Sequence, residues 1–159
     1  MLRDVNRPTT IIYDSTNSIN LEQNDDGIIL FYDTTRNKTL SITRKNLSFG
    51  INHKNITGKR WLRLTSKINS NVHGYKVLRN STITAISIQT QNNVINSRFN
   101  LRINGSASNL HTINLSGVSN IIEDNLNYDI NKGDYIQIFL SVLSGNIDYP
   151  IVLIEYADR

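Results

Sequence analysis

The sequence contains no cysteine, which excludes disulfide bonds, zinc sites with thiolate ligands and cysteine nucleophiles. Its 159 residues include only two prolines, one methionine and one tryptophan. No apolar stretch approaches the roughly 18 residues that a membrane-spanning helix needs, and the polar start MLRDVNRPTT lacks the apolar segment of a secretion signal. We therefore expect no membrane-spanning segment and no secretion signal.

Charged residues are also sparse and evenly spread. Asp, Glu, Lys and Arg make up 19% of the chain and leave a net charge of only +4. The densest basic group is Lys59-Arg60-Trp61-Leu62-Arg63, which fits a strand with a charged outer face. A nucleic-acid-binding protein usually concentrates Lys and Arg in a stripe or a run. We therefore expect no nucleic-acid partner.

The residues that are abundant favour strands. Asn and Ile each account for about one residue in seven, whereas the helix formers Ala, Glu, Gln and Met are rare. Short apolar or alternating runs are separated by turn residues at spacings of roughly 8–12 residues, and no long window shows helical periodicity. The sequence predicts an all-β, antiparallel β-sandwich with about eight strands after residue 59, the number that a jelly roll needs.

Three segments are predicted. Residues 1–26 are polar and contain Pro8, so we interpret them as an N-terminal arm or attachment segment. Residues 27–58 are predicted to form a β-hairpin extension, with strands at Ile28–Tyr32 and Thr39–Arg44 around a polar turn. Residues 59–159 are predicted to form the sandwich, which at this length is one domain with a real core.

The last third of the chain holds its two most apolar runs, Tyr135–Leu143 and Pro150–Ala157. Both are of strand length, and the second is apolar on both faces. A strand in a two-layer sandwich needs only one buried face, so the second must be covered by the N-terminal segment or, as we favour, by neighbouring subunits. The residues predicted to lie at a subunit interface are Tyr135, Phe139, Val152, Ile154 and Tyr156.

No catalytic pattern is present. His53, His73 and His111 lie far apart in the sequence and have no acidic residue at metal-ligand spacing, so no metal site is predicted. No Gly-x-Ser-x-Gly elbow and no glycine-rich phosphate loop occur. Glu155, within an apolar run, is the one carboxylate in a setting that could raise its pKa, but a sheet-edge or subunit-boundary position is the preferred interpretation. We predict a protein that is not an enzyme and has no cofactor.

Two aromatic residues are candidates for contact with a ligand. Trp61, flanked by basic residues, could provide a stacking surface for a sugar ring, or it could fill the core or a subunit contact. Tyr75 is the second candidate. The tripeptide Lys132-Gly133-Asp134 resembles an integrin-type motif, but we interpret it as a hairpin turn.

Some stretches also resemble a known family. GYKVLRNSTITAISIQT (Gly74–Thr90), DINKGDYIQIFLS (Asp129–Ser141) and PIVLIEYA (Pro150–Ala157) are similar to stretches of tumour-necrosis-factor-like jelly rolls from phage and spore-surface proteins. LFYDTTRNKTLSITRKNLSFG (Leu30–Gly50) resembles a segment that accompanies this module in structural proteins of large tailed bacteriophages, including crAss-like gut phages.

The resemblance implies a jelly-roll fold and a homotrimer in which the closing strands form the inner sheet. It implies a virion structural protein, made in the host cytoplasm, that acts as a capsid decoration or head fibre and contacts other virion proteins such as the major capsid protein. The alternative is a carbohydrate- or receptor-binding module of a tail fibre or another tail appendage, with a host-surface glycan as its partner.

Overall fold

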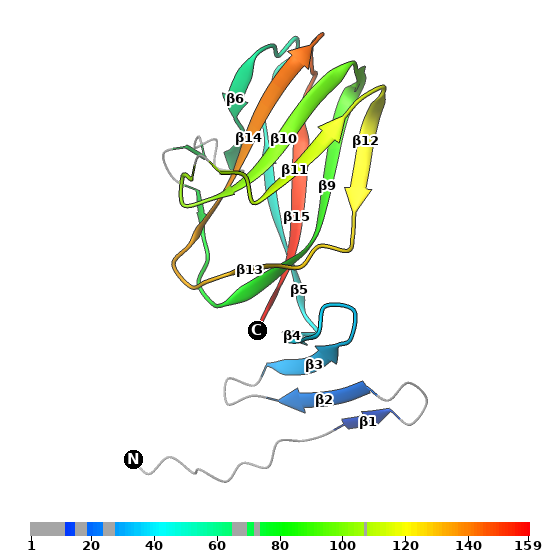
Figure 1. Cartoon of the computed structure of the whole chain (residues 1–159), viewed down its shortest axis with the longest axis vertical. Coiled ribbons are helices and arrows are strands. Elements are labelled where there is room, and N and C mark those ends of the chain that lie inside the picture. The colour runs from blue at the N-terminus through cyan, green and yellow to red at the C-terminus, as the bar shows by residue number, and fades with distance from the viewer. Residues whose placement is uncertain (1–11, 15–18, 24–27, 65–69, 72–73, 107) are drawn as a thin grey trace.

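The computed structural model describes residues 12–14, 19–23, 28–64, 70–71, 74–106 and 108–159. Within these residues the chain is all-β, and its antiparallel strands form a two-layer sandwich and a smaller, separate sheet (Figure 1). This confirms the all-β, antiparallel sandwich predicted from the sequence. The C-terminus lies between the sandwich and the smaller sheet.

The strands of the described residues are, in chain order, β1 (Ile12–Asp14), β2 (Ile19–Gln23), β3 (Ile29–Asp33), β4 (Lys38–Ser41), β5 (Arg44–Gly50), β6 (Lys59–Trp61), β7 (Arg63–Leu64), β8 (Tyr75–Lys76), β9 (Ser81–Val94), β10 (Asn96–Ile103), β11 (His111–Leu115), β12 (Val118–Glu123), β13 (Tyr128–Ile130), β14 (Tyr135–Ser144) and β15 (Ile151–Asp158).

The sandwich is built from two sheets whose inner faces enclose the hydrophobic core. Sheet I has the strand order β12-β9-β15-β5-β7, with β13 also paired to β9. Sheet II has the order β11-β10-β14-β6, with β8 also paired to β14. The largest fully buried side chains include Phe49, Phe99, Ile56, Leu62, Ile83, Ile88, Leu101 and Ile113. They come from both sheets and from the loops that close the sandwich.

The two closing strands occupy central positions, as their apolar character predicts. β15 lies between β9 and β5, and β14 lies between β10 and β6. Side chains of successive strand residues point to opposite faces, so Val152 and Ile154 enter the core and are fully buried. Ile151 and Leu153 point outward and are each 44% exposed. The apolar second face of β15 therefore faces solvent within one chain.

The smaller sheet has the order β1-β2-β3-β4. β3 and β4 form the hairpin predicted for this region, with Leu30 opposite Ser41 and Asp33 opposite Lys38. β1 and β2 fall within residues 1–26, predicted as an arm. The other residues of that arm lie outside the described part of the chain.

The sandwich begins earlier in the chain than predicted. β5 lies within the predicted extension, residues 27–58, yet it pairs with β15 from Arg44 opposite Ala157 to Gly50 opposite Ile151. Leu47 and Phe49 are buried in the core. The predicted boundary between residues 58 and 59 is therefore wrong, because the partner of β5 is supplied by the far end of the chain.

One predicted strand is divided between the two sheets. The sequence predicts a single strand over Trp61–Ser66 with Leu62 and Leu64 on one face, and the last two residues of this prediction lie outside the described part of the chain. Instead, β6 pairs with β14 in sheet II and β7 pairs with β5 in sheet I. Leu62 lies between them, is fully buried, and donates its backbone N–H to the Ile138 carbonyl at 2.9 Å. The chain crosses from one layer to the other at this residue.

Candidate functional site

The outward side of sheet I carries three exposed aliphatic side chains, Ile122, Ile151 and Leu153. We call this surface the apolar outer face and define it by Ser48 of β5, Ala85 and Ser87 of β9, Ile122 of β12, and Ile151 and Leu153 of β15. Ile122 is 72% exposed, and Ile151 and Leu153 are 44% exposed. Large exposed aliphatic residues that share one face mark an interaction surface more often than isolated ones do.

The strand register explains how these side chains come together. Ile122 and Leu153 both lie opposite Ser87, and Leu153 also lies opposite Ser48. Directly opposed residues point to the same side of a sheet, so they form one row across four strands. Small side chains alternate with large ones along this row. A partner can therefore approach the sheet closely between Ile122 and Leu153.

The structure corrects the predicted interface residues. Val152 and Ile154 have no exposed surface and Tyr156 is only 6% exposed, because all three face the core of the same chain. They cannot contact a neighbouring subunit while this chain is folded. Tyr135 and Phe139 belong to β14 of sheet II, on the other layer of the sandwich. The exposed apolar residues of β15 are instead Ile151 and Leu153.

The two aromatic residues predicted to contact a ligand, Tyr75 and Trp61, lie in different environments. Tyr75 packs against the core, and its hydroxyl lies 2.9 Å from the Tyr156 hydroxyl. Burial raises the pKa of Tyr156, and the hydrogen bond with Tyr75 adds to the rise. Because the rings of Tyr75 and Tyr156 both pack against the core, we assign Tyr75 a structural role. Trp61 alone keeps a position from which it can contact a ligand.

Trp61 lies on the outward side of sheet II. Its ring meets Phe139 edge-on at a centroid distance of 4.9 Å, and the Arg102 guanidinium lies 4.4 Å from the Phe139 centroid and 5.3 Å from that of Trp61. Phe139 and Arg102, together with Lys59 and Arg98, line an open hollow beside Trp61, and this lining contains no acidic residue. We call the surface formed by these five residues the basic–aromatic face. Aromatic rings beside cations and amides are suited to stacking and hydrogen bonding with polar rings.

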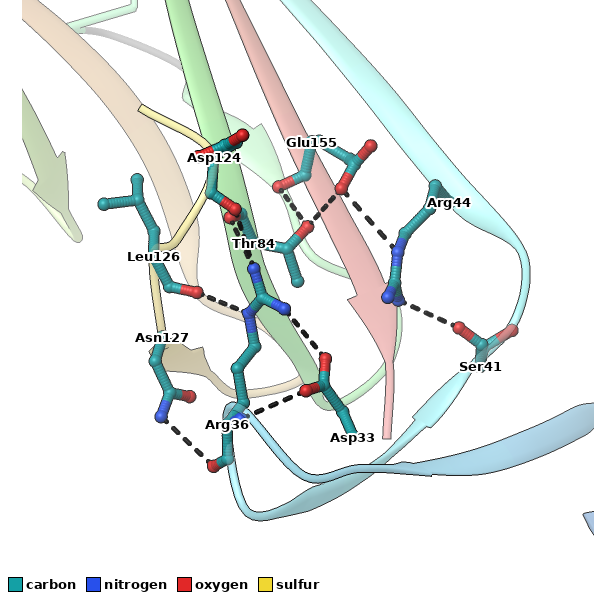
Figure 2. Close-up of polar contacts among 9 residues, drawn as sticks. All are labelled: Asp33, Arg36, Ser41, Arg44, Thr84, Asp124, Leu126, Asn127 and Glu155. Atoms are coloured by element: carbon teal, nitrogen blue, oxygen red, sulfur yellow. Dashed lines mark hydrogen bonds and ion pairs between the residues drawn. The ribbon is translucent and has the colours of Figure 1, made fainter. Parts of the chain in front are cut away.

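A polar joint connects the smaller sheet to the sandwich (Figure 2). Arg36, in the β3–β4 turn, donates hydrogen bonds to the carbonyls of Leu126 (2.7 Å), Thr84 (3.0 Å) and Asp124 (2.9 Å). It also pairs with Asp33 at 2.8 Å. Burial acts to raise the pKa of Asp33, but the hydrogen bonds and charge of Arg36 outweigh it and lower that pKa.

The sequence analysis assigned Arg36 no role. Its partners across the joint are backbone carbonyls of distant residues, which leave no pattern in the sequence. The side chain is only 11% exposed, so its charge is compensated almost entirely by these contacts. Arg36 therefore fixes the smaller sheet in one orientation on the sandwich.

Glu155 has structural partners within its own chain. Its carboxylate accepts a hydrogen bond from the Thr84 hydroxyl at 2.6 Å and lies 3.7 Å from the Arg44 guanidinium (Figure 2). No second carboxylate of the described residues accompanies it in these contacts. This arrangement serves to attach β5 to β15 and β9.

The histidines do not come together. His111 is held between Glu123, 2.6 Å from its Nε2 atom, and the Tyr128 hydroxyl, 2.8 Å from its Nδ1 atom. His53 lies in the loop that follows β5, and His73 lies outside the described residues. Among the described residues, no group of three or more His, Asp or Glu side chains is placed to hold a metal ion.

The tripeptide Lys132-Gly133-Asp134 forms the predicted turn before β14. Gly133 has a φ of 94°, a conformation that favours glycine. The Asp134 carboxylate accepts a hydrogen bond from the Asn131 backbone N–H at 2.7 Å. Turn geometry accounts for all three residues.

No protein-family model, curated protein or solved structure matches this chain. Functional inference therefore depends on the two outer faces of the sandwich, the polar joint and the sequence resemblance. None of the described residues belongs to a helix of the length and apolarity needed to cross a membrane.

Proposed function

We propose that this chain is a non-enzymatic structural protein of a bacteriophage virion that assembles as a homotrimer through its apolar outer face. The observation that carries the assembly is the row of exposed aliphatic and small residues on sheet I, which runs from Ile122 on the edge strand β12 to Leu153 on β15 and Ser48 on β5. Burying these side chains between subunits removes apolar surface from water, at about 25 cal/mol per Å².

The strand order supports a jelly-roll fold of the kind that the resemblance implies. Taken in chain order, β5, β6, β9, β10, β11, β12, β14 and β15 are the first to eighth strands of the sandwich. In these numbers sheet I has the order 6-3-8-1 and sheet II the order 5-4-7-2. Successive strands that wind between two sheets in this way form the paired Greek keys of a jelly roll.

The virion assignment rests on the resemblance to tumour-necrosis-factor-like phage proteins. In this proposal the protein is a capsid decoration or head fibre, made in the host cytoplasm, and its partners are other virion proteins such as the major capsid protein. The joint at Arg36 supports it, because a rigidly held N-terminal sheet can transmit a fixed orientation from the attachment point to the sandwich. Mass spectrometry of purified particles is the test, and a protein missing from them overturns the assignment.

The trimer is tested by sedimentation velocity at micromolar concentration. We expect a species of three times the 18.1-kDa chain mass. Leu153→Asp places a charge in the centre of the apolar outer face and is expected to yield monomers. Leu143→Asp is the matched control, because Leu143 is 47% exposed but lies on β14 of sheet II. A wild-type monomer, or equal dissociation by both variants, contradicts the proposal.

A second candidate function is recognition of a host-surface glycan. The observation that favours it is the stack of Arg102 on Phe139 and Trp61, which presents aromatic surface beside Lys59 and Arg98, two side chains with no charged partner among the described residues. Trp61→Ala removes the ring and should abolish the binding of neutral glycans on an array while leaving the trimer intact. A blank array for the wild type, with antibody labelling of the capsid in electron micrographs, favours the structural role alone.

A further inference from the structure

An open groove of about 630 Å³ lies at the edge of the sandwich where β6 passes into β7. Its walls come from residues 48–53, from Arg60, Arg63 and Leu64, and from Tyr149–Ile151. Leu153 does not line it. The volume falls within the range of about 300–1,000 Å³ that is typical of sites for small organic ligands and is far larger than an inorganic anion needs.

The groove is lined by positively charged side chains, and no acidic residue of the lining neutralises them. Arg60 and Arg63 both line the groove, and neither guanidinium has a hydrogen-bond, ion-pair or ring partner among the described residues. His53 lines it too, and no Asp or Glu does. Arg36 and Arg44, by contrast, each pair with a carboxylate, that of Asp33 and that of Glu155. Two unmatched guanidiniums in one concavity favour an anionic occupant.

The crossover at Leu62 is what brings the two arginines to one groove. Arg60 lies opposite Leu140 in sheet II, whereas Arg63 lies opposite Gly50 in sheet I. Leu62 between them is anchored in the core. The guanidiniums therefore extend from a fixed backbone, and each can present its fork of N–H donors to a planar carboxylate.

The opposite wall is held in a strained conformation. Tyr149 has a φ of 49°, which is costly for a bulky residue and is found most often at functional sites. Its backbone N–H donates to the His53 carbonyl at 2.9 Å, and the Lys54 ammonium lies 5.9 Å from its ring centroid. Gly50 permits this wall to approach, since a Cβ there would lie 3.0 Å from the Pro150 carbonyl oxygen.

We propose that this groove binds a carboxylate-bearing sugar, such as a uronic acid residue of a glycan. Arg60 and Arg63 pair with the carboxylate. Ile51, Leu64 and the Tyr149 ring contact the less polar faces of the sugar, and polar groups such as Asn52 and Ser48 are available to its hydroxyls. A ligand with an anionic group and a ring of mixed polarity pairs with the arginines and also contacts the apolar and polar side chains of the lining. A bare anion or a neutral sugar makes only one of these two sets of contacts.

This site is built from residues of one chain and lies apart from the basic–aromatic face, so it does not depend on glycan stacking at Trp61. A subunit packed on the apolar outer face would cover the part of the groove that Ser48 and Ile151 form. Although Ile151 and Ser48 belong to both the groove and the apolar outer face, Leu153 belongs only to the latter. Binding measured on both the wild type and Leu153→Asp therefore separates a failure of this proposal from a failure of the assembly proposal.

The test is a ¹⁵N–¹H NMR titration of the full chain with sodium glucuronate, with glucose, sodium acetate and inorganic phosphate as comparison probes. We expect glucuronate to shift the amide signals of Ile51, His53 and Tyr149 saturably, with a dissociation constant of about 1 mM, and the three comparison probes to bind at least tenfold more weakly. Arg60→Gln and Arg63→Gln should each weaken glucuronate binding at least tenfold. Lys76→Gln, at an exposed position of β8 that lines neither the groove nor the basic–aromatic face, is the control and should leave binding unchanged.

Each arginine variant is paired with its lysine counterpart, which keeps the charge but lacks the planar fork. Partial recovery in Arg63→Lys relative to Arg63→Gln supports a direct role in holding the carboxylate. Because Arg60 and Arg63 are exposed, we expect these substitutions to leave the fold intact. Amide signals outside the groove that match those of the wild type verify this. The proposal is overturned if glucose, acetate or phosphate binds as tightly as glucuronate, or if both glutamine variants bind it as the wild type does.

Discussion

At the scale of single residues, the protein depends on a few charged side chains with many partners. Arg36 satisfies three backbone carbonyls and one carboxylate across the joint between the two sheets (Figure 2). Asp129 similarly accepts a hydrogen bond from the Thr82 hydroxyl at 2.8 Å and pairs with Lys38 and Arg159. Both clusters connect the β3–β4 hairpin to the sandwich.

The first residue-scale prediction concerns Arg36→Ala. The substitution leaves three carbonyls without their donor and Asp33, whose side chain is 8% exposed, without its cation. We expect the free energy of unfolding to fall by about 3 kcal/mol. Urea denaturation followed by tryptophan fluorescence measures this. Arg98→Ala, which removes an exposed arginine with no partner among the described residues, should change it by less than about 0.5 kcal/mol.

The second prediction concerns acid. Asp33 and Asp129 both have lowered pKa values, since their hydrogen-bonding partners outweigh the burial that raises them. A carboxyl with a lowered pKa in the folded state stabilises the protein above its unfolded pKa of 3.8, and this contribution is lost as the pH falls through the folded pKa.

We therefore expect the thermal unfolding midpoint to fall steeply below about pH 4. Asp33→Asn should be less stable than the wild type at pH 7, and should lose less of its remaining stability between pH 7 and pH 3. Thermal unfolding monitored by circular dichroism across this range is the measurement. Equal pH dependence in both proteins would show that Asp33 does not contribute.

At the scale of elements, the alternation of β15 assigns opposite roles to neighbouring residues. Val152 is fully buried and Leu153 is 44% exposed. The same pattern in β14 buries Ile136 and Ile138 and turns Phe139 toward Trp61. Period-two alternation thus assigns the residues of each central strand either to the core or to an outer face.

The third prediction compares two substitutions on β15. Val152→Asp buries an unpaired charge and should destabilise the fold by about 4 kcal/mol or more, whereas Leu153→Asp should retain wild-type secondary structure. Circular dichroism and expression in soluble form distinguish them. Two folded variants, or two unfolded ones, would mean that the inward and outward faces of β15 are wrongly assigned.

At the scale of the whole molecule, assembly through sheet I has a thermodynamic consequence. A folded trimer in equilibrium with unfolded chains becomes more stable as protein concentration rises, by mass action. The fourth prediction is that the unfolding midpoint of the wild type increases between micromolar and hundred-micromolar concentration, while that of Leu153→Asp stays constant. Differential scanning calorimetry at both concentrations is the measurement, and a constant wild-type midpoint contradicts a trimer that dissociates on unfolding.

Much of the architecture was predictable from local pattern. The runs at Tyr135–Leu143 and Pro150–Ala157 and the hairpin around the turn at residues 33–38 all correspond to observed strands. β12 was missed because Ile121 and Ile122 stand side by side and interrupt the alternation. The break at Leu62 was also missed, because a change of sheet leaves the local pattern of apolar residues intact.

The candidate sites were less predictable because each depends on long-range pairing. The groove needs Arg60 on sheet II and Arg63 on sheet I to meet Tyr149, which lies far along the chain. The joint needs Arg36 to reach carbonyls near Thr84 and Leu126. Composition indicated a basic group around Trp61, but not that it divides between a groove and an outer face.

The amino-acid sequence by itself determined the all-β class, most strand positions and the apolarity of β15 on both faces, because strand formation follows from local periodicity and turn chemistry. The tertiary structure alone decided which face of β15 is inside. Val152 and Leu153 are both apolar, and only the pairing of β15 with β5 and β9, together with the layer that sheet II provides, buries the first and exposes the second. For this reason the surface proposed for assembly lies on Ile151 and Leu153, one residue away from where the sequence alone placed it.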